Sequence, residues 1–441
     1  MGGVWGDKGG DTGGGAATRR AAYLALAVLT AMNLLNYIDR YILAAVIPTI
    51  GKEFPLSETQ KGWVGSAFLI GYVLFSPLVG WLGDRLPRRW LLAAGVGVWS
   101  LATVATGLAQ DFEHLLLTRG FLGLGEATYA ILAPALIADL FPRASRNRAL
   151  TIFYVAIPIG AAFGYALGGF VDPRWGWRNA FYFVGLPGLA AALLAFTFRE
   201  PPRGAAEDVS DDHRRRLAEQ PLTWQSYASL RHNRSYVRNT LGMAMYTFSL
   251  GGLQYWTPNF LQSDRGFTTE SAGLMLGAAV GLSGLVGTAA GGLLADRLAA
   301  RGVRGHYFLA CGLPMLASAP VILAALFLHV PAAIFAAILV GLTLALMNTG
   351  PSNTILVNVT PPRMRAAAVA VNLFLIHLLG DIPSPVLIGT VAQTTGSLLL
   401  GLLLTVPPLL LSGFFFCRGA AYLEADQEAA LRPPTPDTGL A

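Results

Sequence analysis

The chain has 441 residues, of which 54% are hydrophobic and only 13% charged, and its mean hydropathy is +0.53. The charged share is about half of what a soluble domain carries, so the composition excludes an ordinary water-soluble protein. A net charge of +6 could suggest nucleic acid as a partner. The distribution of that charge along the chain favours a membrane topology instead.

Apolar stretches of about 20 residues, the length that crosses the hydrocarbon core of a bilayer, recur along the whole sequence. They predict an all-α polytopic membrane protein with twelve transmembrane helices. The predicted spans are residues 21–50, 60–83, 89–110, 113–139, 147–171, 178–198, 235–262, 270–296, 306–328, 331–358, 365–393 and 397–418.

The longest polar segment divides these spans into two groups of six. Residues 199–234 contain Arg214-Arg215-Arg216, several acids and three prolines, and we predict a cytoplasmic linker between two six-helix bundles, 21–198 and 235–418. The Gly-rich residues 1–20 show no cleavage site after the first apolar stretch and are expected to form a disordered cytoplasmic tail rather than a signal peptide. Residues 419–441 are expected to form a second cytoplasmic tail.

The basic residues of the loops indicate an orientation. With a cytoplasmic N-terminus, the outer loops hold five of the 31 Lys and Arg residues, and most of the others face the cytoplasm. Such an excess of Lys and Arg is typical of cytoplasmic loops, and it adds some attraction to anionic membrane lipids. We therefore expect an inner-membrane protein with both termini in the cytoplasm, no nucleic-acid partner and a monomeric state. The outer-loop basic residues are Lys52, Lys61, Arg174, Arg178 and Arg265.

The first span carries an acid and a base where hydrocarbon is expected, Asp39 and Arg40. Sequence neighbours on a helix point about 100° apart and cannot pair well with each other, so each needs a partner on another helix. The fourth span offers Arg119 and Glu126, which are seven residues apart and share one face. Intramembrane charges indicate a functional site facing the bundle interior or a water-filled cavity. A static cluster of structural ion pairs is the alternative.

An internal repeat supports two parallel halves. Gly80-Trp-Leu-Gly-Asp84-Arg85 ends the second span and Gly292-Leu-Leu-Ala-Asp296-Arg297 ends the eighth, at an offset of about half the chain. Parallel repeats of six helices are a feature of major facilitator transporters.

The residues also resemble motifs of the major facilitator superfamily. The loop from Gly80 to Arg89 resembles its cytoplasmic gating motif, in which the acid caps a neighbouring helix and the bases pair across the halves. Arg119-Gly-x-x-Gly123-x-Gly125-Glu126 resembles its fourth-span motif linked to proton coupling. The glycine row 160, 164 and 168 resembles its fifth-span motif, which we interpret as a helix-packing seam. The predicted gating residues in the loop and its repeat are Asp84, Arg85, Arg88, Arg89, Asp296 and Arg297.

Within that superfamily the sequence resembles the Spinster family. The resemblance rests on Asn33-Leu-Leu-Asn36-Tyr37-Ile-Asp39-Arg40, Gly123-Leu-Gly-Glu126-Ala-Thr-Tyr129, Arg199-Glu-Pro-Pro-Arg-Gly204 and His377-Leu-Leu-Gly-Asp381. It covers most of the N-terminal half and is thinner in the C-terminal half. It implies a lipid transporter, linked to lysophospholipids and sphingosine-1-phosphate, that is driven by protons.

Alternating access of two halves around a midplane site is the expected mechanism. Glu126 is the candidate proton carrier, with Asp39 and Arg119 beside it. Arg40 and Arg119 are candidate head-group ligands because guanidinium binds phosphate bidentately. The other candidate substrate-binding residues are Asn36, Tyr37, Tyr129, Tyr246, Trp256, Asn372 and Phe374.

Some alternatives stay open in the sequence. For the aromatic candidates, plain helix packing is an equal alternative. His377 and Asp381 lie four residues apart on one helix face, and a coupling or gating role competes with a structural hydrogen bond. A proton-coupled transporter of a small organic anion, sugar or drug competes with the lipid transporter. We find no Ser/His dyad, zinc motif or P-loop in the sequence, and expect neither enzymatic activity, nor a cofactor, nor a metal.

Overall fold

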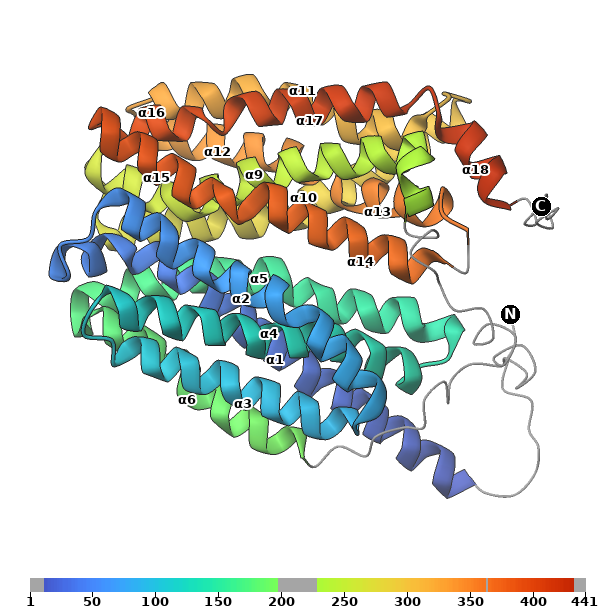
Figure 1. The fold of residues 1–441 in the computed structure, drawn as a ribbon, viewed down its shortest axis with the longest axis horizontal. Coiled ribbons are helices and arrows are strands. Elements are labelled where there is room, and N and C mark those ends of the chain that lie inside the picture. Colours follow the sequence, from blue (N-terminus) through green and yellow to red (C-terminus); the bar gives the residue numbers. More distant parts are fainter. Residues whose placement is uncertain (1–11, 197–227, 362–363, 432–441) are drawn as a thin grey trace, which may run out of the picture.

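The structure is a computed structural model that describes residues 12–196, 228–361 and 364–431, and its regular elements in this part of the chain are all helices (Figure 1). Most of the predicted linker and the two chain ends lie outside the described residues. The predicted all-α class is confirmed.

Six long helices form the N-terminal half, and each coincides with one predicted span. α1 begins at Thr12, within the stretch predicted to be a tail. The bounds are α1 Thr12–Glu53, α2 Glu58–Arg85, α3 Arg88–Gly107, α4 Phe112–Leu140, α5 Arg143–Trp175 and α6 Trp177–Ala195.

The C-terminal half contains the other six spans, three of which are interrupted. Its elements are α9 Arg234–Ser263, α10 Thr269–Ala300, α11 His306–Phe327, α12 Pro331–Leu346 with α13 Thr349–Asn358, α14 Arg365–Ile376 with the π-helix η3 His377–Asp381 and α15 Pro383–Thr395, and α16 Leu398–Leu403 with α17 Val406–Gly419. A 3₁₀ turn, η1 Leu230–His232, precedes α9, and a short helix, α18 Leu423–Leu431, follows α17.

Eleven helical stretches of the described residues are long and apolar enough to cross a membrane. The predicted span that is not among these eleven is the seventh, α9, which has 30 residues and is long enough but carries a lower mean hydropathy. Its polar side chains face other helices: Thr240 bonds Asn372, Ser249 bonds the Thr405 carbonyl, and Tyr255 bonds the Lys61 carbonyl. A span can tolerate such residues because they are satisfied inside the protein.

At one end of the molecule, several helices start at a residue whose side chain caps the helix N-terminus. Ser57 caps α2 in a reciprocal capping box with Gln60, Asp111 caps α4, and Thr268 caps α10. Each cap satisfies a backbone N–H that has no partner within its own helix. Short polar runs between apolar stretches therefore define where these helices start.

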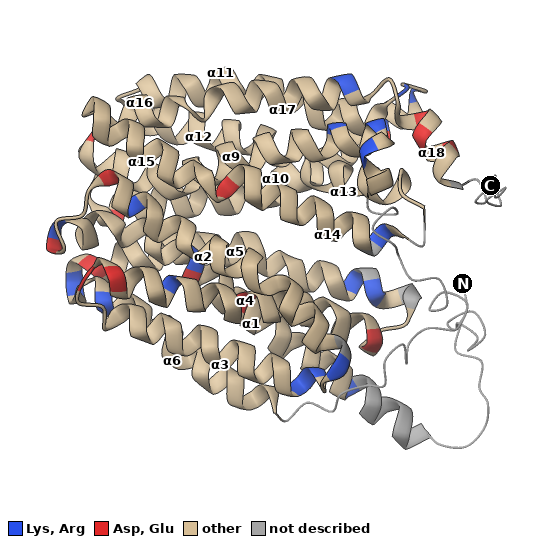
Figure 2. Cartoon of the chain, viewed as in Figure 1, with Lys and Arg blue, Asp and Glu red and all other residues tan. Residues whose placement is uncertain are grey.

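The two halves lie side by side with their helices roughly parallel (Figure 1). We call the end where α6 stops and α9 begins the linker end, and the opposite end, where α1 meets α2, the far end. Charged residues gather at both ends, and a few lie midway along the helices (Figure 2).

The halves meet from the middle of the molecule to the far end. α2 packs on α15, where Gly62 lies against the Pro385 backbone and the Ser66 hydroxyl donates to the Ile382 carbonyl over 2.6 Å. Arg174 of α5 pairs with Glu270 of α10 at 3.0 Å. A buried apolar core runs through both halves in this region, whereas the linker-side part of the N-terminal half has an apolar cluster of its own.

Substitution of Gly62 should open the far end. A Cβ on Gly62 would lie 2.5 Å from the Pro385 carbonyl oxygen and 2.8 Å from Val386 Cα, both of which are backbone atoms of the other half. We expect Gly62→Ala to shift spin-label distances between the far ends of α2 and α15 to longer values. Gly350→Ala is the matched control because its Cβ would meet nothing within 4 Å. Equal distributions in both variants would contradict this view of the closure.

Candidate functional site

Two ion pairs join α1 to α4 in the middle of the N-terminal half. Arg40 Nε lies 2.5 Å from Glu126 Oε2, and Arg119 Nη1 lies 3.4 Å from Asp39 Oδ1. Asp39, Arg119 and Glu126 are buried, and Arg40 keeps 22% of its side chain exposed. The predicted pairing of α1 with the fourth span is confirmed.

Asp39 is held by α3 as well. The indole N–H of Trp99 donates to Asp39 Oδ2 over 2.9 Å, and the Thr103 hydroxyl donates to the same oxygen. A buried carboxylate needs such donors because it has lost its water. The sequence analysis did not identify Trp99 and Thr103, although their spacing of four residues places both polar groups on one face of an apolar helix.

Aromatic rings enclose the guanidinium of Arg40. Its Cζ lies 4.8 Å from the ring centre of Tyr37, 4.7 Å from that of Phe68 and 5.7 Å from that of Tyr72. Arg119 Cζ lies 5.8 Å from the Phe68 ring, so Phe68 contacts both cations. Ring faces attract cations in a dry environment. Tyr37 was predicted, whereas the α2 residues Phe68 and Tyr72 were not.

Three buried polar atoms in this network have no hydrogen-bond partner among the described residues: Asn36 Nδ2, Arg119 Nε and Glu126 Oε1. Two are donors and one is an acceptor. Unpaired buried polar groups are costly, and in native proteins they mark places for water, a proton or a ligand.

Glycine seams bring these helices close enough to make the contacts. Gly160 and Gly164 of α5 lie against α1, where an added Cβ would approach Tyr37 Cβ to 2.7 Å and Tyr41 Cβ to 2.8 Å. The glycine row is therefore the packing seam that the sequence predicted. Gly123 of α4 lies against the α2 backbone, where an added Cβ would clash with the Phe68 carbonyl oxygen.

Gly125 has the same role on the opposite face of α4. A Cβ there would lie 2.5 Å from the Trp99 amide nitrogen of α3. The fourth-span motif thus places Glu126 one residue beyond two close helix contacts. Without these small residues α4 would be held farther from α2 and α3.

The surroundings of the Arg40–Glu126 pair determine the chemistry that is open to it. Burial favours the neutral form of a carboxylic acid, whereas an adjacent guanidinium favours the carboxylate, so Glu126 is held between opposing influences. Arg40 uses only Nε in its ion pair, and its two terminal nitrogens have no hydrogen-bond partner among the described residues.

Several other predicted substrate residues lie in helix packing. Tyr129 is buried against Trp99 and Phe153 and donates its hydroxyl to the Leu29 carbonyl. Trp256 is fully buried and donates to the Pro385 carbonyl over 2.9 Å. Tyr129 therefore adjoins the charge network only through Trp99, and the hydrogen bond of Trp256 goes to the backbone of α15.

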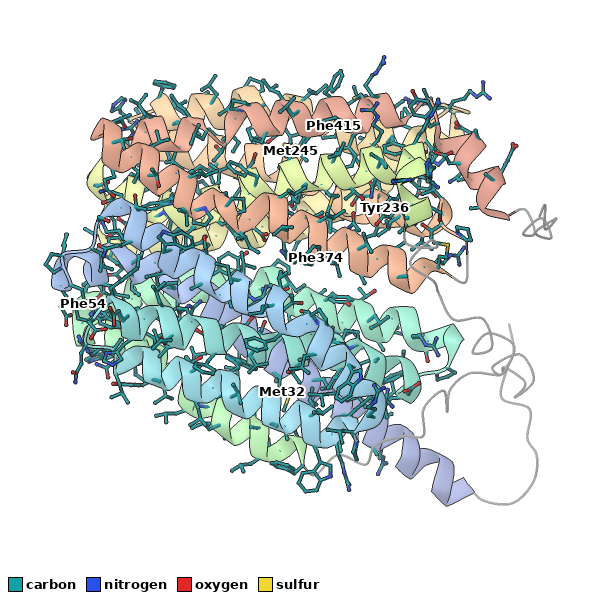
Figure 3. All side chains as sticks on the ribbon, in the orientation of Figure 1. Met32, Phe54, Tyr236, Met245, Phe374 and Phe415 are labelled. Atoms are coloured by element: carbon teal, nitrogen blue, oxygen red, sulfur yellow. The ribbon has the colours of Figure 1, made fainter. Side chains whose placement is uncertain are left out.

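Three predicted residues of the C-terminal half have different surroundings. Asn372 accepts a hydrogen bond from Thr240 over 2.9 Å, and Tyr246 is buried. Phe374 is 47% exposed and lies on the side of the C-terminal half that faces the N-terminal half (Figure 3).

The predicted gating residues lie at the linker end. Arg88 pairs with Asp139 of α4 at 2.6 Å, which is a contact within the N-terminal half rather than across the halves as the resemblance implied. Arg85 covers the Trp81 ring at 4.2 Å, and Arg89 Cζ lies 5.6 Å from the Trp90 ring. Asp296 and Arg297 are exposed. The Asp84 side chain lies outside what the structure describes.

Comparison with known proteins identifies the family. A profile of the Major Facilitator Superfamily matches residues 29–385. Protein spinster homolog 1 of Homo sapiens is 37% identical over 396 residues, which cover 84% of this chain and 73% of that protein. Protein spinster homolog 3 of Danio rerio is 32% identical over 446 residues, which cover 94% and 88% respectively.

Solved structures agree on the fold. A bacterial homologue of the human lysosomal transporter Spinster, in an inward-facing and unoccupied conformation, superposes with a TM-score of 0.76 at 22% identity over 97% of this chain and all of that one. A D-xylose-proton symporter gives 0.69 at 18% identity over 89% and 96%. The chain belongs to the Spinster family of major facilitator superfamily transporters.

Proposed function

We propose that this transporter is a proton-coupled carrier of an amphipathic lipid with a phosphate-bearing head group, such as a lysophospholipid or a sphingoid phosphate. The observation that carries the proposal is the Arg40–Glu126 pair. It combines a buried carboxylate, one oxygen of which has no hydrogen-bond partner among the described residues, with a partly exposed guanidinium that bonds this carboxylate through Nε.

Glu126 is the proton site in this proposal. Its Oε1 has no hydrogen-bond partner in the described structure, so the carboxyl can accept a proton without breaking a second bond. A neutral Glu126 releases Arg40, which is then free to bind phosphate with its fork of donors. Asp39 keeps Arg119 neutralised while Arg40 exchanges partners.

An apolar pocket of the C-terminal half lies across the interface from α1. Tyr41, the neighbour of Arg40, donates to Gln254 Oε1 over 2.9 Å, and Gln254 borders this pocket. The remaining lining comes mostly from α9 to α12 and includes Leu253, Leu276, Val280, Ile322, Leu326 and Ile338. A polar head and an apolar chain would thus be held by different halves.

The cycle proposed is alternating access. With the linker end in the cytoplasm of a cell with an inner membrane, the far end faces outward, and its closure means that the described form is not outward-open. Opening outward requires the contacts of Gly62, Ser66 and Arg174 with the other half to separate.

A substrate screen tests the lipid class. We expect a photoreactive lysophosphatidic acid to label the protein in vesicles, and labelled xylose or succinate not to compete. Arg40→Lys removes the bidentate donor pair of the guanidinium and the Nε hydrogen bond to Glu126. A hydrogen bond to a charged group contributes about 1.5–3 kcal/mol, so labelling should weaken about tenfold or more. Arg304→Lys, at an exposed arginine, is the control. Competition by xylose or succinate would favour the small-solute alternative.

An imposed proton gradient should change the rate of lipid movement. In proteoliposomes of matched protein orientation, we expect lysophosphatidic acid flux to follow the direction of the gradient and to be independent of ATP. Equal rates with the gradient and after its collapse by a protonophore would exclude coupling.

Replacement of Glu126 separates proton coupling from a structural ion pair. Glu126→Gln retains the shape of the side chain but cannot titrate, so gradient-driven flux should collapse while lipid labelling persists and the protein melts near the wild-type temperature. If Glu126 only neutralises Arg40, the variant removes the buried member of the ion pair and leaves Arg40 without a counter-ion, which typically costs about 3–5 kcal/mol in a buried pair, and it should melt early. A stable variant with normal coupled flux would also refute the proton-site assignment.

A further inference from the structure

A five-residue π-helix interrupts the span made of α14, η3 and α15, and its first and last residues form a pair. The Ile382 amide donates to the His377 carbonyl over 3.1 Å, one residue farther along than in an α-helix. His377 Nδ1 lies 2.9 and 3.1 Å from the two carboxylate oxygens of Asp381. The side chains are 19% and 18% exposed. Single π turns occur frequently at functional sites.

This turn contacts both halves. On its own half, Gly380 packs on the Thr247 hydroxyl and the Ala244 carbonyl of α9. Toward the other half, the Tyr72 ring of α2 meets the His377 ring edge-on at 5.8 Å. The bond from Ser66 of α2 to the Ile382 carbonyl adjoins it on the far side. The pair therefore lies at the boundary between the closed far end and the linker end.

The charged and titratable groups around the pair come mainly from α1 and α2. Tyr72 also contacts Arg40, with its ring centre 5.7 Å from Arg40 Cζ, and the Tyr41 phenol of α1 lies on the same side of the pair. Glu126 of α4 forms the ion pair with Arg40. α9 presents the non-titrating Thr247 and Gly251 to the turn, and α15 presents Ser384, whose buried hydroxyl has no partner among the described residues.

We infer that His377 and Asp381 form a second proton-binding site, in the C-terminal half, linked to Arg40 through Tyr72. The inference extends the proposed proton coupling. With Nδ1–H donated to Asp381, the Nε2 atom of a neutral imidazole is able to take up a proton. Uptake converts the pair from a net charge of −1 to a neutral imidazolium–carboxylate pair.

The consequence is an electrostatic link between the halves. The unprotonated pair attracts the Arg40 side of the N-terminal half through the Tyr72 contact, and the protonated pair does so less. Histidine is suited to this role because its charge ordinarily changes between pH 5 and 8. One titrating site in each half then biases the same rocking motion.

The test follows conformation rather than transport. Spin labels on the linker ends of α2 and α14 report their separation in lipid nanodiscs, without substrate, from pH 5 to pH 8. We expect Glu126→Gln, in which the first site cannot titrate, to retain a pH-dependent shift of the distance distribution. Adding His377→Gln should abolish that shift. His329→Gln, at an exposed histidine, should leave it intact.

Two further variants separate the proposed proton binding from effects on folding and test the role of Tyr72. His377→Asn still offers an N–H to Asp381 but cannot become charged, so it replaces the Gln variant if that fails to fold. Tyr72→Leu should diminish the shift while the pair still binds its proton. Loss of all pH dependence in Glu126→Gln alone, or an unchanged shift after His377→Gln, would overturn the inference. The spin-label experiment measures distances and not lipid flux. Its result therefore does not depend on the outcome of the lipid-labelling or proton-gradient experiments.

Discussion

Four ionisable side chains in the middle of the N-terminal half must satisfy one another away from water, and much of this half is arranged around that requirement. Asp39 and Arg40 are neighbours in sequence and point in different directions, so they recruit α4 for partners and α3 for additional hydrogen bonds. Charges at this depth are tolerated only when they are paired or face a cavity. Glycines on α4 and α5 allow the required helix approach.

The two ion pairs are not equivalent. Asp39 has three donors and no exposed surface, which suits a permanent counter-ion for Arg119. Among the described residues Glu126 has a single partner and a second oxygen without one, and Arg40 is the most exposed member of the four. A rigid pair beside an adaptable pair is an arrangement in which one charge can change while the rest of the network stays intact.

The halves also differ in character. Polar and charged groups dominate the centre of the N-terminal half, whereas the C-terminal half presents an apolar pocket and the His377–Asp381 turn. Tyr41 and Tyr72 reach from the first half to the second and contact Gln254 and His377 respectively. Tyr72, which also contacts Arg40, therefore joins the charge network to the opposite bundle by direct contact.

Much of this architecture follows from local sequence properties. Apolar runs of bilayer length determine the spans because an unpaired backbone in lipid is too costly, and opposite charges at helical spacing predicted that α1 would pair with α4. The glycine row on α5 predicted a packing seam because small residues let two helices approach closely. The half-chain repeat indicated two bundles.

Only the tertiary structure decided which side chains complete the site. Trp99, Thr103, Phe68 and Tyr72 each look like ordinary members of an apolar helix, and their role depends on which face α1 presents to them. The same dependence places Tyr129 and Trp256 in packing rather than beside the charges. A single sequence specifies the period of a helix, whereas its rotation and its neighbours are settled by contacts among all twelve spans, which no local pattern contains.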